Sequence, residues 1–167
     1  MTDEYNESMH EISSWRKKKE KIDFHYTIIA SGRDQENILY QISDLDLSEC
    51  VTFTNGLPHE ETVQKLFESD LLLLSSVEEG ISNAVLEAMA LGVPVISTDC
   101  PSGPREILNN GDLGNLVPPA DPELLATEIL NFLNFPSENL EKALKAENSS
   151  LEYLPSRIAQ NYSKELS

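Results

Sequence analysis

Short apolar runs alternate with amphipathic segments along this chain, and the two periodicities predict strands and helices in turn. Strands are expected at residues 24–30, 50–54, 71–75, 93–97 and 115–117. Helices are expected at 3–20, 35–42, 60–68, 83–91, 104–109, 121–133, 137–147 and 155–166. Strands that alternate with helices across short connections build a parallel sheet with helices on both faces. The chain is therefore expected to be an α/β domain with a doubly wound, mostly parallel sheet.

Several residues mark where these elements begin and end. Gly92 suits the end of the 83–91 helix, and Asp121 followed by Pro122 is typical of a helix start. The strand at 71–75 is apolar throughout, which predicts burial on both faces. The acidic, Asn/Ser-rich stretch 147–150 is the expected hinge near the end of the chain.

Length and charge limit the possible functions. The 167 residues suffice for a single domain, expected to span 1–167, and the net charge of −17 argues against binding nucleic acid or an anionic membrane. No apolar run approaches the roughly 20 residues of a membrane span, and residues 1–21 are too polar for a signal peptide, so a cytoplasmic location is expected. The basic cluster Arg16–Lys21 fits a solvated helix end better than a membrane or partner-domain contact. The cysteines and histidines follow no metal-binding spacing, so no metal is expected.

The segment 75–97 carries the candidate chemistry. A strand ends at Ser75, a polar loop with Glu79 and Gly80 follows, and a helix begins near Asn83. This helix is apolar on all sides, which predicts that it is buried, and Glu87 is its single charge. A buried carboxylate needs a partner. From the residues alone, a structural partner and a hydroxyl-rich ligand at the carboxyl end of the sheet are equally good explanations.

The same segment resembles the signature of family-four (group 1) retaining glycosyltransferases. The matching residues are Glu79-Gly80, Glu87 within Leu86–Ala90, and the sequence Gly-Val-Pro-Val-Ile at 92–96. The stretches 97–108 and 114–119 also match, and the resemblance extends from about residue 9 to the C-terminus. It implies the C-terminal, donor-binding domain of a two-domain Rossmann-like (GT-B) enzyme that takes a nucleotide-diphosphate sugar as donor and needs no metal.

The resemblance also implies roles for individual residues. Glu79 is the candidate catalytic-site residue, which would contact the hydroxyls of the transferred sugar, and Glu87 would accept hydrogen bonds from both ribose hydroxyls. The backbone near Leu57 would meet the nucleotide base. Backbone amides would hold the sugar hydroxyls and the diphosphate along one short segment: Gly80, Ile81, Ser82, Asn83 and Ala84. Asp99 and Arg105 are interpreted as structural, and His59 and Thr62 as solvated surface.

The chain departs from the family pattern in two places. The resembling domain begins one strand earlier, with an Arg and a Lys that hold the diphosphate, and Arg33 is not expected to replace them. The N-terminal acceptor domain is also absent from this sequence. Three readings therefore stay open: an N-terminally truncated piece of a glycosyltransferase, a donor-binding subunit that needs a separate acceptor-domain chain, and an inactive remnant. Peripheral membrane contact of a complete enzyme stays open as well.

Overall fold

The computed structural model describes residues 24–31 and 34–151, and every element expected within these ranges forms. The strands are β1 (Tyr26–Ala30), β2 (Val51–Asn55), β3 (Leu72–Leu74), β4 (Val95–Thr98) and β5 (Asn115–Val117). The helices are α2 (Gln35–Asp44), α3 (His59–Phe67), α4 (Asn83–Ala90), α5 (Pro104–Ile107), the 3-10 turn η1 (Asn109–Gly111), α6 (Pro122–Asn134) and α7 (Pro136–Ser150). The expected helices at 3–20 and 155–166, and the cluster Arg16–Lys21, lie outside the described residues.

All strand pairs are parallel, which confirms the expected α/β fold class. β1 pairs with β2, and β4 lies between β3 and β5. A helix separates each strand from the next in the chain, so each strand starts again from the same end. The loops after β2, β3 and β4 therefore gather at the carboxyl ends of the strands.

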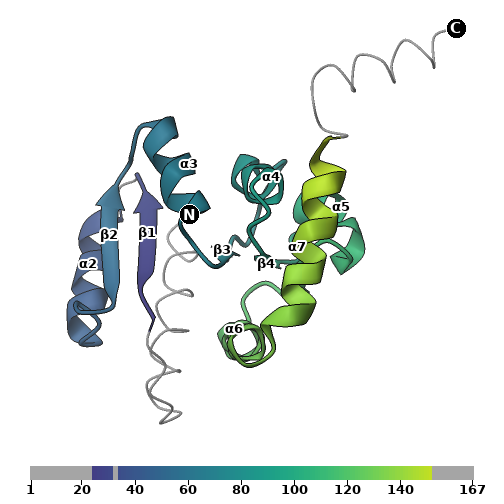
Figure 1. Cartoon of the computed structure of the whole chain (residues 1–167). Helices are drawn as coiled ribbons and strands as arrows, with labels where there is room; N and C mark the ends of the chain where they lie inside the picture. The colour runs from purple at the N-terminus through teal and green to yellow at the C-terminus, as the bar shows by residue number, and fades with distance from the viewer. Residues whose placement is uncertain (1–23, 32–33, 152–167) are drawn as a thin grey trace, which may run out of the picture.

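Helices cover both faces of the three-stranded sheet, because successive side chains of a strand point to opposite faces. On β4, Val95 belongs to an apolar cluster with α4 and α5, whereas Ile96 packs with α6. Figure 1 shows α4 and α6 on opposite sides of β4. A separate cluster joins α2 to β1 and β2 through Ile28, Ile38 and Val51.

The expected burial of the 71–75 strand on both faces is wrong in degree. All three residues of β3 are half-buried, whereas all four of β4 are buried. The difference follows from position, since β4 is flanked by strands on both sides. Within the described residues, β3 pairs with a strand on one side only.

The expected hinge at 147–150 is also wrong, because these residues continue α7 to Ser150. Ala143 and Ala146 of this helix are buried, and Ala146 joins the core cluster of α4. A polar contact fixes the helix to β5: Asn115 donates to the buried Asn139 at 2.9 Å and accepts from Lys142 at 2.7 Å. Packing and hydrogen bonds therefore keep this segment helical, although its polar composition predicted a hinge.

The predicted helix ends are confirmed. Asp121 caps α6, because its carboxylate accepts from the backbone N–H of Leu124 at 2.9 Å, and Pro122 is the first helical residue. Gly92 follows α4 with φ of +67°, a conformation that glycine adopts without strain. None of the helices described is both long and apolar enough to cross a bilayer.

Candidate functional site

The candidate site is built on the loop that connects β3 to α4, residues 75–82, at the carboxyl ends of β3 and β4. Thr98, the last residue of β4, donates through its hydroxyl to the carbonyl oxygen of Ser76 at 2.5 Å and to that of Leu74 at 3.3 Å. The thiol of Cys100 donates to the same Ser76 oxygen at 2.8 Å. Both donors are buried, so the start of the loop is anchored to β4.

A second contact anchors the outer part of the loop. Gly103, with φ of +88°, packs so closely on Gly80 that a Cβ at 103 would overlap the Gly80 carbonyl oxygen. The Ser102 hydroxyl donates to the carbonyl oxygen of Glu79 at 2.9 Å. Beside this contact, Arg105 forms an ion pair with Asp99, which agrees with the structural interpretation of both residues.

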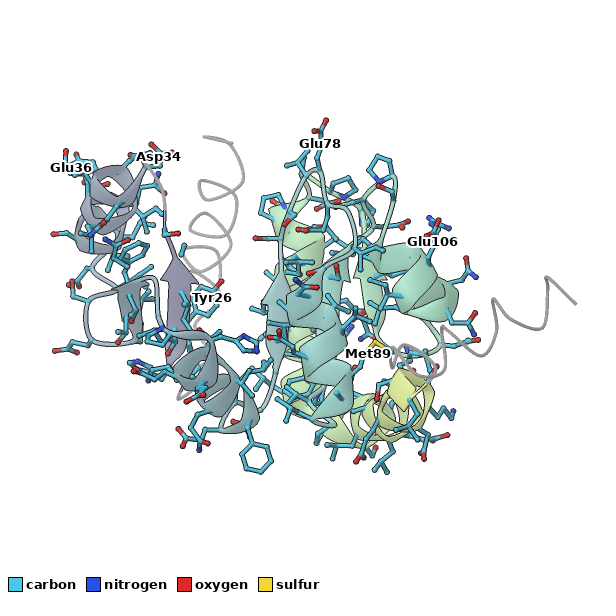
Figure 2. All side chains as sticks on the ribbon, turned by 90° about the horizontal axis from the view of Figure 1, so that it is seen from above. Tyr26, Asp34, Glu36, Glu78, Met89 and Glu106 are labelled. Atoms are coloured by element: carbon cyan, nitrogen blue, oxygen red, sulfur yellow. The ribbon has the colours of Figure 1, made fainter. Side chains whose placement is uncertain are left out.

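Glu79 is held by this loop, whereas its neighbour Glu78 is not. The Glu79 carboxylate accepts from the Ser76 hydroxyl at 2.9 Å, and the side chain is half-buried. Glu78 is exposed, and Figure 2 shows it at the outer end of the loop, pointing away from the protein. Of the two adjacent carboxylates, Glu79 therefore has the more defined position.

The N-terminus of α4 follows directly. The first backbone bond of the helix runs from Leu86 N–H to the Ser82 carbonyl, so the N–H groups of Asn83, Ala84 and Val85 have no acceptor within the helix. The Ser82 side chain is buried but makes no cap bond. Gly80 and Ile81 are exposed beside these donors. Such a helix end attracts an anion.

Glu87 is less buried than the sequence predicted. Its side chain is 29% exposed, and its carboxylate lies 3.8 Å from Nδ1 of His59 on α3. The helix buries Val85, Ala88 and Met89 but leaves its other face partly open, so the expectation of a helix buried all round is wrong. The carboxylate is consequently accessible to a ligand.

A cavity of about 480 Å³ lies against this open face of α4. α4 contributes Asn83, Leu86, Glu87 and Ala90, and the end of the chain's described part contributes Glu147, Asn148, Ser150 and Leu151. The structure thus brings Asn83 and Glu87 to one cavity. Glu79 and Gly80 lie before α4 in the loop and do not line it. Within the described residues, no three His, Cys, Asp or Glu side chains form a group that could hold a metal ion.

Two further residues lie at the start of α3. Leu57 is half-buried in the short connection from β2 to α3. His59 has an exposed side chain (73%), as expected for surface, but its contact with Glu87 was not anticipated. No sequence spacing relates the two residues, because the fold alone brings the start of α3 beside the middle of α4. Arg33 lies outside the described residues.

Comparison with known proteins identifies the family. A family model described as "Glycosyl transferases group 1" matches residues 4–134. The chain belongs to the group 1 glycosyl transferases. Within this family it is 38% identical over 113 residues to the amylovoran biosynthesis glycosyltransferase AmsK of Erwinia amylovora, an alignment that covers 64% of this chain and 28% of AmsK.

Solved structures share the fold of this group 1 chain. HepE from Anabaena, crystallised with UDP, aligns with a TM-score of 0.79 at 19% identity, over 95% of this chain and 44% of HepE. The C-terminal domain of the group 1 protein LpcC from Francisella tularensis aligns with a TM-score of 0.73 at 19% identity, over 93% of this chain and 82% of that domain. The chain is therefore Rossmann-like, and it spans less than half the length of AmsK and HepE.

Proposed function

We propose that this chain binds the nucleotide-sugar donor of a retaining glycosyltransferase, and that the acceptor is bound by a domain outside this sequence. One observation carries the proposal: the loop with Glu79, the free N-terminus of α4 and the accessible carboxylate of Glu87 follow one another at the carboxyl ends of β3 and β4. In open α/β sheets, ligands bind outside these strand ends.

The diphosphate of the donor is assigned to the N-terminus of α4. The N–H groups of Asn83 and Ala84 are free of helical acceptors, and the exposed backbone of Gly80 and Ile81 lies just before them. Because the net charge of −17 opposes an anionic ligand, local donors of this kind are needed. Ser82, which lies between these donors in the sequence, is buried.

The two carboxylates are assigned to the sugar rings. Glu87, at the cavity of about 480 Å³, accepts hydrogen bonds from the ribose hydroxyls, and the cavity has the size of a small-molecule site. Glu79, held by Ser76, contacts the hydroxyls of the transferred sugar near the reacting carbon. The backbone at Leu57 faces the nucleotide base. No metal takes part in this scheme.

The relatives support this division of labour. HepE has been crystallised with UDP, and the LpcC structure that resembles this chain is a C-terminal domain. The chain covers only 28% of AmsK, so the remainder of such an enzyme supplies acceptor binding. We therefore expect residues 1–167 alone to transfer no sugar and to bind donor weakly.

Saturation-transfer NMR of residues 1–167 with UDP-, GDP- and ADP-sugars tests the proposal. One of these donors should give signals from its ribose protons, and Glu87→Gln should reduce them because a neutral amide is a weaker acceptor for hydroxyl donors. Glu106→Gln, at an exposed carboxylate on α5, is the matched control and should leave the signals unchanged. Equal loss in both variants, or no signal from any donor, would contradict the assignment.

A further inference from the structure

Ser76 lies three residues before Glu79 in the loop that connects β3 to α4. Its hydroxyl donates to Oε2 of the Glu79 carboxylate at 2.9 Å, and both residues are half-buried. Within the part of the chain that the structure describes, no Lys, Arg or His side chain forms an ion pair with Glu79. The hydroxyl of Ser76 is therefore the side-chain group that sets the direction of this carboxylate.

The main chain of Ser76 is fixed from the core of the sheet. Its carbonyl oxygen accepts from the Thr98 hydroxyl at 2.5 Å and from the Cys100 thiol at 2.8 Å. Both donors are buried, with Thr98 3% exposed and Cys100 1% exposed. A chain of hydrogen bonds thus runs from the end of β4 through Ser76 to the carboxylate of Glu79.

The main chain of Glu79 is held by a different residue. The Ser102 hydroxyl donates to the Glu79 carbonyl oxygen at 2.9 Å, which fixes the backbone but leaves the side-chain torsions free. A long side chain that is free before a ligand binds must be ordered during binding, and this lowers the affinity. Because Ser76 bonds to the carboxylate itself, it orders the Glu79 side chain before a ligand arrives.

We propose that Ser76 is a positioning residue for the sugar of the donor and acts through Glu79. The inference rests on the proposed function, in which Glu79 contacts the transferred sugar. Ser76 uses one lone pair of Oε2, and a carboxylate has about four acceptor sites, so Glu79 can still accept from sugar hydroxyls. Ser76 therefore strengthens binding of the sugar and leaves binding of the nucleotide unchanged.

The affinity gained from the sugar tests this role. UDP, GDP and ADP are each compared with their glucose conjugates by NMR titration of residues 1–167, and the sugar gain is the ratio of the two dissociation constants. Ser76→Ala should lower the sugar gain about two- to tenfold, the effect of ordering one long side chain during binding. The affinity for the nucleoside diphosphate should stay the same. Ser76→Thr keeps a hydroxyl and should keep the gain.

Two further variants separate positioning from a general change of the loop. Ser102→Ala removes the bond to the Glu79 main chain and should lower the sugar gain less than Ser76→Ala does. Glu79→Ala should abolish the gain, and adding Ser76→Ala to it should then have no further effect. An equal loss in Ser76→Ala and Ser102→Ala, or a loss from Ser76→Ala that persists without Glu79, would overturn the positioning role.

A readout without ligand completes the test. Side-chain coupling constants of Glu79 should report one χ1 rotamer in the free wild-type chain and in Ser76→Thr, and averaging over rotamers in Ser76→Ala. Averaging in the wild-type chain would overturn the inference even if Ser76→Ala failed to fold. The two levels fail differently: no binding of any nucleotide contradicts the donor site itself, whereas a gain that depends on Glu79 but not on Ser76 contradicts the positioning role alone.

Discussion

The imidazole of His59 on α3 lies 3.8 Å from the carboxylate of Glu87 on α4. The two helices follow β2 and β3, which belong to different groups of strands. The contact therefore joins the two parts of the domain at the side where the loops gather. Glu87 itself is half-buried and lines the cavity beside α4.

His59→Ala should have little effect on stability. The His59 side chain is 73% exposed, so solvent screens the pair, and such contacts contribute about 0–1 kcal/mol. Thermal unfolding should shift by no more than a few degrees. Donor binding should persist, because Glu87 supplies the acceptor for ribose. Loss of binding in His59→Ala together with normal binding in Glu87→Gln would reverse these roles.

Gly103→Ala should be strongly destabilising. The added Cβ would overlap the Gly80 carbonyl oxygen, and the φ of +88° is unfavourable for alanine. We expect a loss of about 2–4 kcal/mol in the free energy of unfolding, measured by urea denaturation. Gly80→Ala is the control, because no atom lies within 4 Å of its Cβ position. If both substitutions lowered the free energy of unfolding equally, the close contact between Gly103 and Gly80 would be contradicted.

Thr98→Val should loosen the start of the site loop. The substitution keeps the shape of a side chain that is 3% exposed but removes its hydroxyl bonds to Ser76 and Leu74. The Ser76 carbonyl still accepts from the Cys100 thiol, so losing the hydroxyl bonds should cost about 0.5–1.5 kcal/mol. Thr127→Val removes an exposed bond to its own helix and should change stability by less than about 0.5 kcal/mol. Chemical denaturation measures the free energy of unfolding of both variants. An equal loss in both would mean that the Thr98 hydroxyl does not anchor the loop.

Asp121→Ala should destabilise the chain by about 1 kcal/mol, because Leu124 N–H loses its cap. Asp121→Asn should retain most of this stability, since asparagine caps helices equally well. Differential scanning calorimetry of the two variants checks the expectation. A melting temperature for the alanine variant equal to that of the asparagine variant would mean that the cap does not stabilise α6.

The local pattern was sufficient to predict most of the elements. The 83–91 helix and its end at Gly92 could be predicted because apolar residues, a polar start and a terminal glycine agree there. The sequence could not predict which face of α4 stays open, since an apolar surface all round carries no directional information. The exposure of Glu87 depends on where α3 and α7 pack, and their positions result from contacts distant in sequence.

Tertiary packing also explains why two sequence predictions were wrong: the hinge at 147–150 and the full burial of the 71–75 strand. Residues 147–150 have the composition of a hinge, yet the buried Ala146 holds the end of α7 against α4. The strand at 71–75 has the composition of a central strand, yet its burial depends on whether strands lie on both sides. The local sequence shows neither the helix that packs against residues 147–150 nor the strands that lie beside residues 71–75. The site signature at Glu79 and Glu87 was recognisable because both residues lie in one continuous segment.

The most direct test of donor binding is amide chemical-shift mapping of ¹⁵N-labelled residues 1–167 titrated with UDP to millimolar concentration. The account predicts that the largest shifts fall on Gly80, Ile81, Asn83, Ala84 and Leu57, with Glu87→Gln reducing them and Glu106→Gln leaving them unchanged. GDP and ADP titrated in parallel identify the preferred base. If all three nucleotides leave the amides of residues 80–84 unmoved, or if the shifts concentrate on α6 and the outer face of α7, the proposed donor site is contradicted.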